Sequence, residues 1–355
     1  MSPARTLHVV VPDGIDDPAR PSGGNTYDRR VCEELAADGW SVSVRGVAGD
    51  WPRPGEEALV ALERTLTSIP DEALVLVDGL VASGAREVMV PASRRLRVVL
   101  LVHTPFGHPD GPSGPVEGER DVARAAAAVV VTSDWTRTWL LEAYDLDPAQ
   151  LHVARPGVDA APPAAGSGTG RNLLCVGAVT AGKGHDVLLA ALSHLADQDW
   201  RCVCVGSLTK SPEVVDGLFH DIKTAGLDDR LELAGSRTGG ELEASYAGAD
   251  LLVVPSRGET YGMVVTEALA RGLPVLATAV GGVPEALGET SDGRVPGLLV
   301  PPADASALAD ALTRWLSDPG LRDELREIAG ERRRGLRGWP ETADLVAEAL
   351  SGVSG

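Results

Sequence analysis

Two glutamates separated by seven residues, Glu259 and Glu267, are the side chains with the clearest chemical meaning in this sequence. Glu259 follows an apolar run, Leu251–Val254, that predicts a buried strand, and Glu267 lies in a predicted helix over Val264–Arg271. Backbone N–H groups at a strand-to-helix junction, together with the helix dipole, favour a bound diphosphate. Carboxylates repel phosphate, so we expect the two glutamates to bind sugar hydroxyl groups. The pattern therefore predicts a nucleotide sugar as the ligand.

The backbone between the two glutamates is expected to contact the oxygens of this donor. It comprises Thr260, Tyr261, Gly262 and Met263. Because glycine has no Cβ, Gly262 allows a ligand to approach the main chain closely.

A cation for the diphosphate is predicted at Lys183, one of only three lysines in the chain. It lies between two glycines, Gly182 and Gly184, in a loop between a predicted strand and a predicted helix. A lone loop lysine is most often merely solvated, but this position suits neutralisation of a leaving diphosphate.

Composition restricts the classes of partner. The chain has 355 residues, with 32 basic and 51 acidic side chains and a net charge of −19. Such a charge disfavours nucleic acid and docking on anionic lipid. A leader before Leu7 and a long apolar run are both lacking, so we expect a cytoplasmic protein without stable membrane insertion.

The four cysteines are predicted to be ordinary core residues rather than metal ligands. Cys202 and Cys204 alternate along a predicted strand and should share one buried face. Their spacing does not match a metal site, and no histidine is close in sequence. No metal cofactor is expected, because the helix N-terminus and Lys183 neutralise the diphosphate.

The elements that position these residues alternate between apolar strands and helices, which predicts an α/β fold with parallel sheets covered on both faces. The length suggests two domains. A run of small residues, proline and glycine over 158–170 is the best linker candidate, separating a domain over 1–157 from one over 171–337. Doubly wound domains of this kind bind ligands at the carboxyl ends of their strands.

The predicted strands of the first half are Leu7–Val11, Ser41–Val44, Leu74–Val77, Arg97–His103 and Ala128–Thr132, with a polar loop over 12–24 and a helix from about Thr26 to Ala37. Those of the second half are Asn172–Val176, Cys202–Gly206, Leu231–Leu233, Leu251–Val254, Val275–Ala277 and Leu298–Val300.

Taken in order, several segments resemble the retaining glycosyltransferases of family 4. The segments are Ser22-Gly23-Gly24-Asn25, Val102-His103-Thr104-Pro105, Val131-Thr132-Ser133, Val153–Asp159, Val176-Gly177 through Lys183-Gly184, Glu259–Glu267 and Gly338–Ala343. The resemblance implies the GT-B fold, in which two doubly wound Rossmann-like domains face each other across a cleft. It also implies that a last helix, about 338–355, crosses back to the first domain.

The resemblance further implies roles for individual residues. Glu267 is similar to the family's ribose ligand, and Glu259 to the residue that contacts the donor sugar. His103 is similar to a histidine near the reacting centre, although a purely structural histidine is the alternative. Gly23 and Gly24 are similar to a glycine loop that approaches the donor phosphates.

One position departs from the family pattern. Many relatives have an arginine directly after the glycine that corresponds to Gly177, whereas this chain has Ala178. Either one cation for the leaving group is missing, or Arg237 or Arg257 supplies it. The sequence does not rank these two.

The resulting interpretation is a metal-independent, retaining transferase that moves a hexose-type sugar from a nucleoside diphosphate, with UDP preferred over GDP, to a hydroxyl of a small molecule. The first 157 residues hold 15 basic and 23 acidic side chains, which makes a cationic acceptor such as an aminocyclitol one candidate. His108 lies on a loop that is a candidate border of the acceptor site. The alternatives are a GT-B epimerase or phosphorylase, or a catalytically weak nucleotide-sugar-binding protein.

Overall fold

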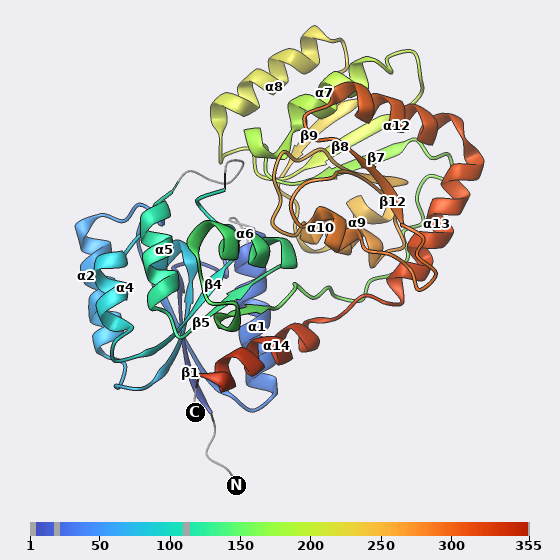
Figure 1. Cartoon of the computed structure of the whole chain (residues 1–355). Helices are drawn as coiled ribbons and strands as arrows, with labels where there is room; N and C mark the ends of the chain where they lie inside the picture. Colours follow the sequence, from blue (N-terminus) through green and yellow to red (C-terminus); the bar gives the residue numbers. More distant parts are fainter. Residues whose placement is uncertain (1–4, 18–21, 109–113, 354–355) are drawn as a thin grey trace. The chain divides into compact units, whose positions relative to one another are not determined.

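The chain forms two compact units, each built on its own parallel sheet (Figure 1). The structure, a computed structural model, describes residues 5–17, 22–108 and 114–353. Unit 1 combines Met1–Gly157 with Arg337–Gly355, and unit 2 comprises Val158–Leu336.

Unit 1 contains a six-stranded sheet with the strand order β2-β1-β3-β4-β5-β6, in which every neighbouring pair is parallel. Its strands are β1 (Thr6–Pro12), β2 (Ser41–Val47), β3 (Leu74–Asp78), β4 (Arg97–Val102), β5 (Ala128–Val131) and β6 (Leu151–Val153). Its helices are α1 (Gly23–Ala37), α2 (Glu56–Thr67), α3 (Gly79–Ser83), α4 (Arg86–Ala92), α5 (Val116–Ala125), α6 (Asp134–Tyr144), the short η1 (Pro148–Gln150) and α14 (Trp339–Gly352).

One face of this sheet carries a continuous apolar core. Alternate residues of β3 and β4, including Val75, Val77, Val98 and Leu100, pack against helices α2 to α6. Strands buried in this way read as nearly unbroken apolar runs, which is why the sequence signals them clearly.

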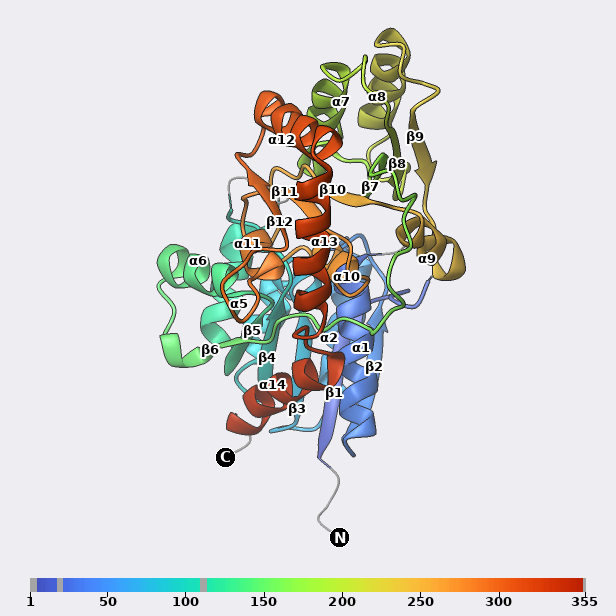
Figure 2. The same cartoon turned by 90° about the vertical axis from the view of Figure 1, so that its right-hand side faces the viewer.

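The last helix, α14, packs beside α1, although the two are more than 300 residues apart in sequence (Figures 1 and 2). Trp339 at its start meets the buried ring of Tyr27 edge-on, with the ring centroids 5.8 Å apart. Tyr27 also donates a hydrogen bond to the carbonyl oxygen of Ala154 at 2.9 Å. Unit 1 is therefore completed by residues from the end of the chain.

Unit 2 contains the second six-stranded parallel sheet, with the order β12-β11-β10-β7-β8-β9. Its strands are β7 (Asn172–Val176), β8 (Arg201–Val205), β9 (Leu231–Gly235), β10 (Leu251–Val254), β11 (Val275–Thr278) and β12 (Gly297–Val300). Its helices are η2 (Ala181–Lys183), α7 (His185–Ser193), α8 (Pro212–Thr224), α9 (Gly239–Ala247), α10 (Met263–Leu269), α11 (Val283–Leu287), α12 (Ala305–Ser317) and α13 (Pro319–Arg333).

Both faces of the unit 2 sheet are covered by apolar side chains. Residues of α7, α8 and α12 pack on one face and residues of α9, α10 and α11 on the other. The strand order reverses between β7 and β10, and the carboxyl ends of strands beside such a reversal are where doubly wound sheets bind ligands.

Most predicted elements are present, with three differences. Helix α1 begins at Gly23, because the Ser22 side chain accepts a hydrogen bond from the Asn25 N–H, so Gly23 and Gly24 are helical rather than part of the predicted loop. The short strand β6 was not predicted. The proposed linker is also not a free tether, since the N–H groups of Ala164 and Gly166 bond to carbonyls inside unit 2.

Candidate active site

The predicted cation and the first predicted glutamate lie together in unit 2. The Lys183 Nζ is 2.5 Å from Oε1 of Glu259, and the same oxygen accepts a hydrogen bond from the Ser256 hydroxyl at 2.9 Å. Lys183 follows β7 and Glu259 follows β10, so the pair lies at the carboxyl ends of the two strands beside the reversal. The aliphatic part of Lys183 passes Gly177, where an added Cβ would be 3.7 Å from its Cδ.

These two loops contact each other through their backbones. The N–H of Arg257 donates to the carbonyl of Gly182 at 2.8 Å. Gly184 has φ +68°, and a Cβ there would lie 2.0 Å from the carbonyl oxygen of Pro255. Only glycine fits this position, and the absence of a side chain there lets the Lys183 loop contact the Glu259 loop.

The Arg257 side chain joins the two loops through hydrogen bonds. Its guanidinium binds both carboxylate oxygens of Asp186, at 2.8 and 2.6 Å, and the carbonyl of Ala181 at 2.7 Å. The hydrogen bond from Arg257 lowers the pKa of Asp186. Arg257, one of the two candidate cations for the leaving group, is thus bound to residues on either side of Lys183.

Arg237 has different neighbours. It donates to the Ser245 hydroxyl at 2.9 Å and to Glu232 at 3.4 Å. Within the described ranges, no hydrogen bond or ion pair joins Arg237 to Lys183 or Glu259. The structure does not bring this predicted donor ligand into the Lys183 cluster.

Glu267 is held by two residues that the sequence analysis missed. The phenol of the fully buried Tyr246 donates to Oε2 of Glu267 at 2.7 Å. Arg271 lies over the Tyr246 ring, 4.4 Å from its centroid, donates to the Glu267 carbonyl at 2.7 Å and is ion-paired with Glu243. Burial raises the pKa of Glu267, and the opposing effects of Tyr246 and Arg271 only partly offset this rise.

The backbone between the glutamates forms a compact turn into α10. Gly262 caps the helix with φ +92°, Tyr261 is buried, and Thr260 and Met263 are half-buried. A second glycine pair, Gly281 and Gly282, packs under this turn. A Cβ on either glycine would come within 2.2 Å of the carbonyl oxygen of Glu259 or Thr260. These two glycines were not predicted as site residues; the Gly-Gly step shortly after β11 is the sequence signal that could have identified them.

In unit 1, His103 directly follows β4, and its side chain contacts two buried carboxylates. Its Nε2 is 2.9 Å from Oδ1 of Asp28 and 3.5 Å from Oδ2 of Asp78. Gly24 lies against the ring, since a Cβ there would be 3.2 Å from the histidine Cδ2. Gly24 therefore makes room for His103, and Gly23 is the first residue of α1.

The loop that follows His103 is anchored by a buried carboxyl group. Glu119 accepts a hydrogen bond from the Phe106 N–H at 2.9 Å and another from the Tyr144 hydroxyl. Burial raises the pKa of Glu119 to about 7. His108 packs edge-on against Trp135 and Trp139, with centroid distances of 4.8 and 5.9 Å, while residues 109–113 lie outside the described ranges.

The cysteines are buried and free, as predicted, but the expectation that no histidine lies nearby is wrong in space. Nε2 of His185 is 3.8 Å from Sγ of Cys175, and Cys204 is the neighbour of Cys175 across β7 and β8. These three groups and the set Asp28, Asp78 and His103 are close enough to be candidate metal ligands. The sequence also has two Asp-x-Asp triplets, Asp145–Asp147 and Asp197–Asp199, and both make local contacts. Asp145 ends α6 and Asp147 caps η1, while Asp199 is ion-paired with Arg171.

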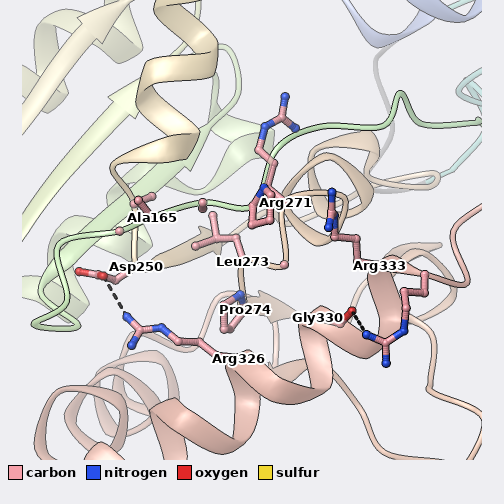
Figure 3. A pocket seen from close by; sticks show the side chains of 14 residues that line it. Ala165, Asp250, Arg271, Leu273, Pro274, Arg326, Gly330 and Arg333 are labelled. Carbon is pink, nitrogen blue, oxygen red and sulfur yellow. Dashed lines mark hydrogen bonds and ion pairs between the residues drawn. The ribbon is translucent and has the colours of Figure 1, made fainter.

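A pocket of about 350 Å³ lies elsewhere in unit 2, between the segment over 163–166, the amino ends of β10 and β11, and α13 (Figure 3). Its lining includes Asp250, which is ion-paired with Arg326, and the arginines at positions 271, 333 and 334. None of the predicted site residues lines it, and it opens at the opposite end of the strands from Lys183.

Comparison with known families identifies both halves of the chain. Residues 162–332 match the model of glycosyl transferases group 1, and residues 21–161 match that of glycosyltransferase family 4. None of the helices in the described ranges is long and apolar enough to cross a membrane.

The curated proteins that are similar to the chain include two enzymes called D-inositol 3-phosphate glycosyltransferase. The protein of Kineococcus radiotolerans is 34% identical over 260 residues, which cover 67% of this chain and 60% of that protein. The protein of Streptomyces bingchenggensis is 31% identical over 351 residues, covering 92% and 74%. The chain thus spans about three fifths of the length of the first of these relatives.

Solved structures show the same fold at lower identity. Sucrose-phosphate synthase from Thermosynechococcus elongatus has a TM-score of 0.78 at 22% identity, covering 98% of this chain and 99% of that one. The Anabaena protein HepE, solved with UDP and glucose, also has a TM-score of 0.78, at 18% identity, covering 98% and 100%. The predicted fold is confirmed, and the chain belongs to glycosyltransferase family 4, with the GT-B fold.

Proposed function

We propose that the protein transfers a hexose-type sugar from a nucleoside diphosphate to a hydroxyl group of a small cyclitol, with retention of anomeric configuration. The observation that carries this proposal is the arrangement at the strand reversal of unit 2. There Lys183 is paired with Glu259, and Glu267 lies on the helix that follows Glu259. A cation paired with one carboxylate, and a second carboxylate on the following helix, suit a ligand that has both a diphosphate and sugar hydroxyls.

Each of these side chains has a distinct proposed role. Lys183 neutralises the diphosphate as it leaves, and Glu259 accepts hydrogen bonds from the donor sugar. The Glu259 carboxylate also favours positive charge that develops at the anomeric carbon. Glu267 accepts hydrogen bonds from the ribose hydroxyls, in an orientation that Tyr246 holds. The backbone of Thr260 to Met263 contacts the donor oxygens.

UDP is the proposed nucleotide, and no metal ion is required for transfer. A structural neighbour at 18% identity was solved with UDP-glucose, which supports UDP only by analogy. Because Lys183 supplies positive charge at the leaving group, activity should survive a chelator. A loss of turnover in EDTA that returns with Mg²⁺ or Mn²⁺ would contradict metal independence.

The acceptor is proposed to be a cyclitol, bound by unit 1. The names of the relatives favour an inositol phosphate, whereas the acidic composition of residues 1–157 favours a neutral or amino-substituted ring. Parallel assays with D-inositol 3-phosphate, myo-inositol and an aminocyclitol distinguish these cases. Release of nucleoside diphosphate that depends on the acceptor separates a transferase from an epimerase.

Donor binding is tested first, by thermal shift with UDP-glucose, UDP-N-acetylglucosamine and GDP-mannose. We expect a stabilising shift with at least one UDP-sugar, which Lys183→Met and Glu267→Gln should each abolish or strongly reduce. The matched control is Lys223→Met, an exposed lysine on α8. If the donor stabilises the Lys183 variant as well as it stabilises the control, the proposed site is wrong.

A further inference from the structure

A buried cluster of sulfur and nitrogen atoms lies in unit 2, next to the loop that carries Lys183. Cys175 on β7 and Cys204 on β8 are partners across this parallel pair of strands, and His185 is the first residue of α7. All three residues are at most 3% exposed. Nε2 of His185 is 3.8 Å from Sγ of Cys175, and one nitrogen or sulfur atom of each residue lies within 4.8 Å of those of the other two. Side chains from three elements thus converge on one point.

The surroundings of this cluster are unfavourable for a histidine. The core that contains both cysteines is apolar and includes Leu173, Val187 and Leu188. A buried imidazole needs partners for both of its nitrogens, yet Nδ1 of His185 has no hydrogen-bond partner among the described residues. The partner of Nε2 is a thiol, which is a weak donor and a weak acceptor. An aliphatic side chain would be less costly here, so packing alone does not explain the histidine.

The donor atoms suit a thiophilic metal ion. Thiolate and imidazole groups are typical ligands of Zn²⁺, whereas Mg²⁺ and Ca²⁺ prefer oxygen. Zinc–sulfur and zinc–nitrogen bonds of about 2.3 and 2.0 Å at a tetrahedral angle give a separation of about 3.6 Å between the two ligand atoms. The separation of 3.8 Å between Nε2 of His185 and Sγ of Cys175 is close to this value. An ion could therefore bind both atoms with little movement of the side chains.

A fourth ligand is available on β8. Structural zinc sites have four ligands, and three cysteines with one histidine is one of their established combinations. Cys202 is fully buried two residues before Cys204, on the same side of the strand, and the two thiols interact. Three of the four cysteines in the chain are thus gathered beside one histidine.

We propose that Cys175, Cys204 and His185, with Cys202 as the fourth ligand, form a buried structural site for a zinc ion. The ion ties β7 and β8 to the start of α7. Because His185 follows Gly184 directly, the ion also holds the end of the loop that carries Lys183. It binds while the chain folds, since the ligands are closed to solvent in the folded unit. The ion touches no substrate, so this inference does not depend on the proposed function.

The first test measures zinc in the full chain, produced in zinc-supplemented medium, freed of any affinity tag and purified with a phosphine reductant that keeps the thiols reduced. Mass spectrometry of the metals should find an equimolar amount of zinc. Cys204→Ala should lose it, whereas Cys32→Ala, which removes the buried cysteine of unit 1, should retain it. A wild-type protein without zinc, or a Cys204→Ala protein that keeps the ion, overturns the proposal.

The second test needs no substitution and so does not depend on whether a variant folds. The wild-type chain is produced in minimal medium with Co²⁺ in place of zinc. We expect the strong visible bands of tetrahedral cobalt, together with thiolate-to-cobalt charge-transfer bands in the near ultraviolet. A folded protein that contains no cobalt, or contains it without the charge-transfer bands, contradicts a site built from cysteines.

The structural role is tested by melting protein from zinc-depleted medium beside protein from zinc-supplemented medium. The zinc-loaded protein should have the higher melting temperature, because an ion that binds only the folded state stabilises it. Equal melting temperatures at different zinc contents would contradict a structural role. A loaded protein that binds no UDP-sugar refutes only the proposed function, and a zinc-free protein that binds one refutes only this site.

Discussion

Tyr246 shows how a single buried side chain determines the geometry of the donor site. Its hydroxyl holds one oxygen of Glu267, and its ring is covered by Arg271. Removing only the hydroxyl leaves the packing of the ring intact. Glu267 then loses its orientation, and its pKa rises further because the Tyr246 hydroxyl no longer stabilises the carboxylate.

Tyr246→Phe should weaken binding of a UDP-sugar about fivefold, the loss expected for one hydrogen bond of about 1 kcal/mol. Isothermal titration calorimetry measures this change. Tyr144→Phe is the matched control, since it also removes a phenol hydrogen bond to a buried glutamate, Glu119, but does so in unit 1. Equal affinity in the wild type and Tyr246→Phe would mean that Glu267 is oriented in some other way.

Glu119 makes the stability of the protein depend on pH. Its pKa is about 7 in the folded state, against about 4.5 when exposed, so folding favours the protonated form. Its contribution to stability is full below pH 4.5 and is lost as the pH rises through 7. We expect Glu119→Gln to reduce the fall in unfolding free energy between pH 5 and pH 8, by up to about 3 kcal/mol.

Urea denaturation at the two pH values measures this difference. Glu117→Gln, on the same helix but exposed, should retain the wild-type pH dependence. His103 and Asp78 titrate in the same range in all three proteins, so their contribution cancels in the comparison. A Glu119 variant with the wild-type slope would show that the carboxyl is not buried in its neutral form.

The sequence predicted those site residues whose signal is local. Lys183 and Glu259 lie next to glycines in loops that follow strands, and Glu267 lies in the helix directly after the second of these loops, so each can be recognised from its local segment. Asp28 could not be found in this way, because an aspartate in a predicted helix is usually solvated. Only the three-dimensional structure, in which Asp28 and Gly24 of α1 lie against His103 after β4, shows that they meet.

At the scale of elements, the loop that carries Lys183 depends on one glycine. Gly184 combines a left-handed backbone with a close approach to the Pro255 carbonyl, and both are unfavourable for any larger residue. Gly184→Ala should therefore destabilise unit 2 by about 1–3 kcal/mol and displace Lys183 from Glu259.

The control for this substitution lies two residues earlier. A Cβ at Gly182 meets no atom within 4 Å, so Gly182→Ala should leave the melting temperature nearly unchanged. Differential scanning calorimetry with and without a UDP-sugar measures both the melting temperature and its shift on donor binding. If Gly184→Ala retains the wild-type melting temperature and donor shift, the loop is more adaptable than the structure indicates.

Strands were predicted better than helix starts and edge elements, for physical reasons. The buried strands β7 and β10 have continuous apolar runs, and their bounds agree with the prediction. The predicted start of α1 was three residues too late, because the sequence did not show that Ser22 caps a helix that begins with two glycines. Strand β6 was missed because it is only three residues long and contains His152.

At the scale of the whole molecule, the two units differ in how the chain completes them. Unit 2 is continuous in sequence and contains both of its apolar layers. Unit 1 needs α14, on which Trp339, Val346 and Leu350 are almost fully buried. The Thr342 hydroxyl also donates to the Arg155 carbonyl at 2.8 Å, and a Cβ at Gly157 would collide with the backbone of Gly338.

We therefore expect the fragment 158–336 to fold alone and to bind a UDP-sugar, whereas 1–157 alone should not unfold cooperatively. Exposing several fully buried apolar side chains at about 1.5–3 kcal/mol each removes an amount comparable to the whole stability of a domain. Joining 337–355 to residue 157 through a flexible linker should restore a cooperative transition in thermal circular dichroism. If 1–157 melts cooperatively without α14, then the first sheet supports its own fold, and the return of the chain to unit 1 is not needed for its stability.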